Sequence, residues 1–306
     1  MIYQYSKTLI DQLPETFIKK YTSNPLHLNI IFEGGLFNGS YLIGCLFYLK
    51  ELEKRNLVKI EKLSGCSIGS IACILHFIDD EQISLEIYKL AYHHFKENLN
   101  LDIFEKIFKI LKDNLPENAM EQINNNVYIS YYNVETGKQV VRKKYKNLDD
   151  LCETIRRSCS FPYVIDNQIY YKGKYVDGMY PYVFSKQSAK NLYLNIHNLD
   201  QLLGMISVKH ENTNIHRILE GMIEIHLFFL KNAKTNICSF VDQWSWTDKL
   251  KHYLFIRFFN IVIFIWHKIF VLQTILQDTL ESKNVYLRVK KLLSTLYVHI
   301  LRSYCV

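Results

Sequence analysis

The sequence predicts an α/β fold with a mostly parallel central sheet and a helical extension at the C-terminal end. Three observations predict it. A strand, a glycine-bearing turn and a helix follow one another twice between residues 26 and 77; six of the 11 glycines lie in the same region; and the chain after Gly221 has helical periodicity and no glycine. Strands that alternate with helices pair in parallel, because each helix carries the chain back along the sheet.

The first strand is the apolar run from Leu26 to Phe32, which leads into the glycine-bearing turn EGGLFNGS. Residues Tyr41 to Arg55 then carry apolar side chains at helical spacing and end in charges. A second short strand over residues 57–65 ends in another glycine turn, and an apolar helix follows through about Phe77. This order is typical of a parallel α/β sheet.

The elements beyond this region are helices and hairpins, followed by one more strand. We expect helices over residues 81–95, 100–113 and 148–162, hairpins over residues 127–145 and 169–178, and a strand over residues 192–196. The chain therefore divides into an N-terminal segment (1–26), an α/β domain (27–205) and a helical extension (206–306) that packs on the core or at a membrane surface.

Composition and charge limit the function classes. The formal net charge of +7 permits attraction to phosphate-bearing partners such as anionic lipid. The basic residues are scattered among acids without a nucleic-acid-binding signature, so no nucleic-acid partner is expected. The seven cysteines form no zinc-finger spacing, which indicates reduced core thiols and no metal site. The first 20 residues lack the features of a signal peptide, so we expect a cytoplasmic protein.

Glycine is scarce in this chain and is concentrated in one region. An even spread would place one or two glycines in residues 34–69, where six are found. Such a concentration indicates positive φ angles or a close approach of the main chain to another group. The six are Gly34, Gly35, Gly39, Gly44, Gly65 and Gly69.

The stretch GCSIG, made of Gly65, Cys66, Ser67, Ile68 and Gly69, has the form of a nucleophile elbow. A nucleophile on a sharp strand-to-helix turn requires nearly side-chain-free neighbours two positions before and after it. The N-terminus of the following helix also lowers the cost of a nearby anion. The pattern alone also arises by chance, and its strand-turn-helix setting is what favours a functional Ser67.

Two further motifs flank this elbow in the sequence. The turn GGLFNG (residues 34–39) can point backbone N–H groups at a developing oxyanion. A phosphate-binding turn is the alternative, but the chain has no GxGxxG and no Walker lysine, and Glu33 directly precedes the turn. In YVDGMYPY, Asp177 and Gly178 place a carboxylate where a hairpin strand ends, although most Asp-Gly pairs are plain turns.

Together and in this order, the three motifs resemble those of patatin-like phospholipases, a family of lipid acyl hydrolases. The family's pattern is GGGxKG or GGGxRG, then GxSxG, then DGG or DGA; this chain has GGLFNG, GCSIG and DGM. The segments GSYLIGCLFYLKEL and TIRRSCSFPYVI resemble the helix after the family's glycine turn and the stretch before its DG motif. The resemblance covers about residues 27–200 and implies a three-layer hydrolase fold with a mostly parallel central sheet.

By this resemblance, Ser67 is the nucleophile and Asp177 its general base, a dyad without histidine. Attack of Ser67 on an acyl ester gives an acyl-enzyme that water then hydrolyses. The substrate implied is a phospholipid or another acyl lipid, with no metal or cofactor, and a membrane surface is a possible partner. The oxyanion hole would be formed by the backbone of Gly34, Gly35, Leu36, Phe37, Asn38 and Gly39.

Three positions depart from the family's pattern. Leu36 replaces the third glycine of the turn and restricts it if that position needs positive φ. Asn38 replaces the basic residue, which removes a charge but keeps an amide donor, and Met179 replaces the small residue of the DG motif. The expected function is lipid acyl hydrolysis; the alternative is a catalytically impaired protein of the same fold that acts as a membrane-associated binding or scaffolding protein.

A second kind of serine hydrolase also needs to be considered. An α/β-hydrolase requires a late histidine, but it generally has more strands before its elbow than this chain offers, and it leaves the Asp177 motif unexplained. The available late histidines are His210, His216, His226, His252, His267 and His299.

Residues 253–276 form the most apolar stretch of the chain. Its longest run without charge or histidine, Phe258 to Trp266, is too short for a bilayer core of about 30 Å. Arg257 and Lys268 flank that run, as in a helix that lies at an interface. For this stretch and a final helix over residues 285–300, three arrangements are open: packing on the core or on each other, docking on a membrane surface, or a true span.

Overall fold

The computed structural model describes residues 2–186, 188–197, 203–209, 211–278, 295–296 and 298–305. Within them, a seven-stranded sheet has the order β4-β3-β2-β1-β6-β7, and β5 pairs with β3 off this path. The strands are β1 (Leu26–Phe32), β2 (Val58–Cys66), β3 (Val127–Asn133), β4 (Lys138–Arg142), β5 (Tyr175–Val176), β6 (Lys190–Leu194) and β7 (Cys238–Phe240).

The centre of the sheet is parallel and its edges are antiparallel. Strand β1 pairs in parallel with β2 and with β6, and β2 pairs in parallel with β3. Strands β4, β5 and β7 are antiparallel to their neighbours. The prediction of a mostly parallel central sheet is therefore confirmed, and β1 has the bounds expected from its apolar run. The hairpin predicted over residues 169–178 is reduced to β5 and one bridge between Tyr171 and Tyr175.

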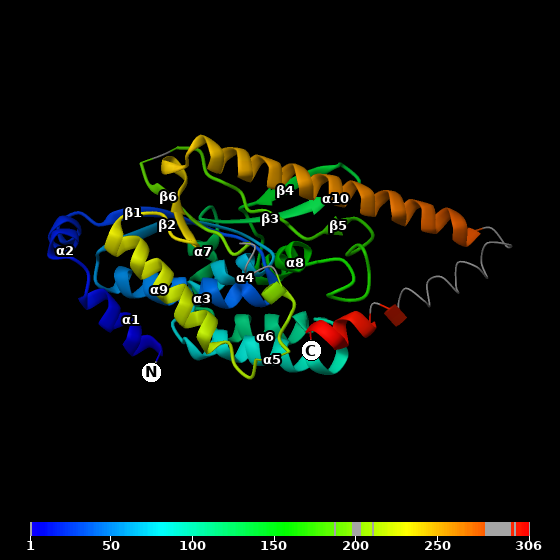
Figure 1. Ribbon diagram of the computed structural model, residues 1–306, viewed down its shortest axis with the longest axis horizontal. Helices are drawn as coiled ribbons and strands as arrows, with labels where there is room; N and C mark the ends of the chain where they lie inside the picture. The colour runs from blue at the N-terminus through cyan, green and yellow to red at the C-terminus, as the bar shows by residue number, and fades with distance from the viewer. Residues whose placement is uncertain are drawn as a thin grey trace.

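Helices cover one face of this sheet and build the main core. Alternate β1 side chains Leu28, Ile30 and Phe32 are buried in a cluster to which the helices of this layer contribute, whereas Ile31 belongs to another cluster on the opposite face. Figure 1 shows these helices below the sheet. They are α1 (Ile2–Asp11), α3 (Gly39–Lys54), α4 (Ile68–Leu75), α5 (Gln82–Asn98), α6 (Phe104–Asn114), α7 (Ala119–Ile123), α8 (Leu148–Ser158) and α9 (Ile215–Lys231), with α2 (Glu15–Thr22) at the margin.

Helix α9, from the predicted extension, packs directly against α3. A Cβ atom at Gly44 would lie 2.0 Å from the carbonyl oxygen of Ile218, and one at Gly221 would lie 2.1 Å from that of Tyr41. The two helices therefore approach closely enough to require glycine on both. Residues 215–240 thus complete the helical layer and the sheet edge, although the domain boundary at residue 205 stays a prediction.

The opposite face of the sheet is covered by a loop and by α10 (Trp246–Asp278). Ile31, Phe184 and Tyr193 form a small cluster there, with Trp244 packed against it. Figure 1 shows α10 running along the top of the view, above β3, β4 and β5, and extending past them. With helices on both sides, the sheet is the middle of three layers.

Helix α10 is the least buried large element that the structure describes. Among its described side chains, only Ile263 is fully buried. Residues Trp246–Leu272 form a helix long and apolar enough to cross a membrane by length and composition. The final helix expected over residues 285–300 lies largely outside the described residues, and Leu301–Cys305 packs beside α5.

Candidate active site

Ser67 lies at the sharp turn between β2 and α4. Its backbone angles, φ 50° and ψ −130°, are unfavourable for a residue with a Cβ atom. The turn is tight because Gly65 and Gly69 approach each other: a Cβ atom at Gly65 would lie 2.3 Å from the Gly69 carbonyl oxygen. The close approach expected from the glycine concentration is therefore confirmed at this elbow.

The glycine turn after β1 touches the elbow. A Cβ atom at Gly34 would lie 2.9 Å from the Cβ of Ser67, so this position admits no side chain. Within the described part of the chain, the N–H groups of Gly35 and Leu36 donate no hydrogen bond. Two unused donors beside a serine are the arrangement that an oxyanion requires. Phe37 and Asn38 are buried in the same turn, and Gly39 begins α3.

Two of the unusual residues of these motifs adopt left-handed backbone conformations. Leu36 has φ 47° and Met179 has φ 55°. A left-handed non-glycine residue costs about 1–2 kcal/mol, which the surrounding packing must offset. Met179 is buried, and Leu36 packs against the cluster around Phe37. Leu36 therefore occupies a positive-φ position, which is the condition under which leucine was expected to restrict the turn.

Asp177 follows β5 and is 2% exposed. Its N–H donates to the Ser160 carbonyl oxygen at 3.1 Å, and the N–H of Gly178 donates to the Ser158 carbonyl oxygen at 3.0 Å. The Ser158 hydroxyl accepts the Ser67 N–H at 2.9 Å and donates to the Ser130 carbonyl oxygen at 2.6 Å. The end of α8 therefore fixes Ser67 and Asp177 relative to each other.

Sequence reasoning did not assign Ser158 and Ser160 a role. Their segment, TIRRSCSFPYVI, was noted only as a resemblance to the stretch that precedes the DG motif. Its two small hydroxyl residues near the end of a helix were the available signal. Nothing in the spacing indicated which strand or turn they would contact.

The Asp177 carboxylate is buried and has a raised pKa. Burial raises its pKa to about 6, against the lowering effects of the Met179 N–H, the Ser67 hydroxyl and the His197 charge. Its Oδ1 accepts the Met179 N–H at 3.0 Å, whereas Oδ2 has no hydrogen-bond partner among the described residues. The second oxygen is thus left to interact with Ser67.

Glu33 and His197 form a buried pair close enough to Asp177 for the His197 charge to affect it. His197 Nδ1 is 2.9 Å from Glu33 Oε2, and Glu33 also accepts the Tyr193 hydroxyl at 2.9 Å and the Ile196 N–H at 3.0 Å. Burial disfavours the His197 cation, but the charge and hydrogen bond of Glu33, together with Asp177, outweigh it and raise the pKa of His197. From the sequence, Glu33 only disfavours a phosphate-binding turn. These contacts give it a structural role at the end of β1.

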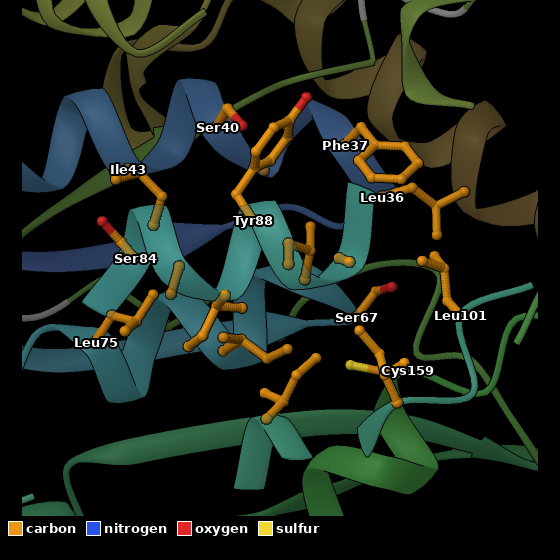
Figure 2. A pocket seen from close by; sticks show the side chains of 18 of the residues that line it. Leu36, Phe37, Ser40, Ile43, Ser67, Leu75, Ser84, Tyr88, Leu101 and Cys159 are labelled. Carbon is orange, nitrogen blue, oxygen red and sulfur yellow. The ribbon is translucent and has the colours of Figure 1, made fainter. Parts of the chain in front are cut away.

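An apolar pocket leads away from Ser67. Its lining comes from α3, α4, α5 and α6, with Ile43, Leu75 and Phe104 among the side chains. Figure 2 shows Ser67 at one end, between Leu36 and Cys159, and Leu75 at the other. A pocket of this composition suits a hydrocarbon chain whose reacting group lies at the serine.

No histidine lines this pocket among the residues that the structure describes. His226 instead accepts or donates a hydrogen bond with Tyr48 at 3.1 Å, and His267 does so with Tyr170 at 3.2 Å. His210 lies outside the described residues. The geometry therefore gives no support to a histidine triad with Ser67.

Arg217 of α9 holds the glycine turn from outside the three motifs. Its Nη1 donates to Asn38 Oδ1 at 2.7 Å and to the Gly204 carbonyl oxygen at 2.7 Å, and its Nε donates to Glu211 at 3.0 Å. Asn38 Nδ2 in turn donates to the Ile196 carbonyl oxygen at 3.2 Å. Arg217 is 2% exposed, so its guanidinium is held in place among these partners. Its hydrogen bond to Oδ1 sets the orientation of the Asn38 amide. Sequence reasoning missed Arg217, which lies 179 positions from Asn38.

Comparison with known proteins agrees with this geometry. The profile of the family described as "Patatin-like phospholipase" matches residues 30–180, a stretch that contains the glycine turn, the elbow and Asp177. Residues 30–180 therefore belong to the patatin-like phospholipase family. With the three-layer architecture described above, this match confirms the predicted fold class.

Other comparisons are weaker. A comparison with curated proteins found no match. Among solved structures, the chain is similar to VipD from Legionella pneumophila, with 10% identity and a TM-score of 0.30 over 55% of this chain. The chain thus spans about half of the length of VipD, 49%.

The pKa of Asp177 predicts a pH profile. We expect kcat/KM for ester hydrolysis to rise with pH through about 6 and then level off, because a general base must be ionised. Replacing His197 by Gln removes a charge that lowers the pKa of Asp177, so the rise should move to higher pH. Both profiles are measured with a soluble short-chain ester. The same rise in Asp177→Asn protein would assign it to another group.

Arg217→Lys tests the support of the glycine turn. Lysine keeps the charge but loses the fork that contacts Asn38, so we expect kcat to fall by about tenfold or more with little change in KM. Glu211→Gln is the control, because it weakens the ion pair of Arg217 and leaves the Asn38 contact in place. An equal loss of kcat in the control would show that Arg217 acts through stability alone.

Proposed function

We propose that this protein hydrolyses acyl esters of lipids, in the manner of a phospholipase A, with Ser67 as nucleophile and Asp177 as general base. One observation carries the proposal: four features meet at Ser67. These are the elbow that holds it, the turn from Gly34 to Leu36, the Asp177 loop and the apolar pocket. Each supplies something that acyl transfer needs, namely a nucleophile, oxyanion donors, a base and a site for the acyl chain.

The reaction would proceed in two steps. Ser67 Oγ attacks the ester carbonyl carbon as its proton passes to Asp177, and the N–H groups of Gly35 and Leu36 donate to the oxyanion. The carbon–oxygen bond to the leaving alcohol breaks, and Asp177 returns the proton to that oxygen. Water, deprotonated by Asp177, then attacks the acyl-serine, releases the fatty acid and restores the Ser67 hydroxyl with that proton.

The pocket supports a lipid substrate in particular. Its lining is almost entirely aliphatic and aromatic, and its few hydroxyls include Ser40, Ser67 and Ser84. An extended acyl chain gains about 0.8 kcal/mol for each methylene that it buries, whereas a short polar ester gains little. We place the protein in the cytoplasm, peripheral on membranes, since its substrates would be bilayer lipids.

The rival function is a scaffolding protein with a damaged site. Leu36 and Met179, the two departures from the motif pattern that have positive φ, favour it, since they add strain to the glycine turn and to the DG motif. Strain at a functional site is also common in active enzymes, so it does not favour loss of activity. Measurement of turnover separates the two.

Fatty-acid release from mixed phospholipid vesicles tests the proposal. We expect release by the wild type and a loss of at least about a thousandfold in Ser67→Ala and in Asp177→Ala, because each removes a reacting group. Ser84→Ala is the matched control: this serine lines the same pocket but bonds only to the Glu81 carbonyl oxygen among the contacts described, and it should keep most of the activity.

A folded wild type that releases no fatty acid from any of these vesicles would contradict the hydrolase. Equal release by wild type and Ser67→Ala would contradict the role of Ser67.

A further inference from the structure

The outer face of α10 is an exposed apolar surface. Phe258, Ile261 and Phe264 are 60%, 58% and 59% exposed. Contiguous apolar surface of this extent is rare on a soluble monomer and indicates an interaction site. Other large apolar side chains that the same helix exposes are Trp246, Leu250, Tyr253, Leu254, Ile265, Ile269, Phe270, Val271, Leu272 and Ile275.

The charges on this helix are mostly basic. Trp246–Leu272 contains Lys249, Lys251, Arg257 and Lys268 but a single acid, Asp248. That acid is neutralised by Lys234, whose Nζ lies 2.6 Å from its Oδ1. An exposed apolar face with a net positive charge is complementary to the headgroups and acyl chains of an anionic lipid surface.

The inner face of α10 is fixed to the catalytic domain. Ile263 is buried in one cluster with Met179 and Tyr180, next to Asp177. The rings of Trp266 and Phe161 are 6.0 Å apart, and those of Phe255 and His197 are 5.2 Å apart. A helix held along its side in this way lies against the domain, and it cannot cross a bilayer without losing these contacts.

The spacing of the charges also argues against a span. Arg257 and Lys268 are 11 positions apart, which corresponds to about 16 Å along a helix. A bilayer core is about 30 Å thick, so a spanning α10 would place at least one of these charges in hydrocarbon. Because 11 residues make about three turns, the two side chains leave the same side of the helix and reach headgroups together when it lies flat.

We propose that α10 lies flat on a membrane containing anionic phospholipid and holds the Asp177 side of the catalytic domain against it. The proposal deepens the proposed function, because it names the surface at which the acyl ester is met. Binding is independent of turnover, so it is tested with protein that cannot react.

The test is flotation of full-length Ser67→Ala protein with vesicles. We expect binding to phosphatidylcholine vesicles that contain about 30% phosphatidylserine. Binding to phosphatidylcholine alone should be at least about tenfold weaker, because one or two basic side chains near an anionic surface strengthen binding by about that factor. Arg257→Gln with Lys268→Gln should remove most of this preference. Ile261→Glu with Phe264→Glu should abolish binding to both vesicles, since the apolar contact is lost.

The control is Ile223→Glu, which changes an exposed apolar residue on α9 (39% exposed) and should leave binding unchanged. Circular dichroism and the Tm show that each variant is folded. Binding that survives Ile261→Glu with Phe264→Glu overturns the proposal. A dimer in solution that this double change dissociates would make a second copy the occupant, and resistance of bound protein to alkaline extraction would indicate a span; either result also overturns it.

Because the binding test uses Ser67→Ala, its outcome is distinct from that of the hydrolase test. Binding without any wild-type fatty-acid release would support docking and contradict the hydrolase. Release without binding through α10 would support the hydrolase and contradict docking.

Discussion

The candidate site depends on how closely main-chain segments approach one another around Ser67. A Cβ atom at Gly69 would lie 2.5 Å from the Phe32 carbonyl oxygen, and one at Gly178 would lie 2.2 Å from that of Ser130. The ends of β1, β2 and β3 thus meet the elbow and the Asp177 loop with no space for side chains. This contact sets the strained angles of Ser67, brings the glycine turn beside it, and buries the Asp177 carboxylate, whose pKa is raised.

The parts of this site that sequence predicted are those with a local physical cause. The apolar run of β1, the helical spacing of α3 and the small residues around Ser67 each restrict the backbone within a few positions. Since parallel strands place their carboxyl ends at one edge of the sheet, the two glycine turns were bound to meet there. Asp177 was predicted as a site residue from the order of the three motifs. Its Asp-Gly pair alone would not have distinguished it from a plain turn.

What could not be predicted depends on contacts between distant segments. Arg217 contacts Asn38 only because glycines at positions 44 and 221 let α9 approach α3, and neither glycine indicates which helix it will meet. Ser158 is similar, since one hydroxyl joins the elbow to β3. The sequence showed that α10 is apolar, but its exposure could not be predicted. Composition does not distinguish a helix buried in a core from one on the surface.

The central claim is that Ser67 is an activated nucleophile in an intact oxyanion site. The most direct measurement is mass-spectrometric peptide mapping of the folded protein after exposure to a fluorophosphonate, which phosphonylates activated serines with loss of fluoride. If Ser67 is activated in this way, one residue is modified, Ser67, and labelling is greatly slowed in Asp177→Asn protein, which lacks the proposed base. Folded wild-type protein that stays unmodified, or that carries the label on another serine, would contradict it.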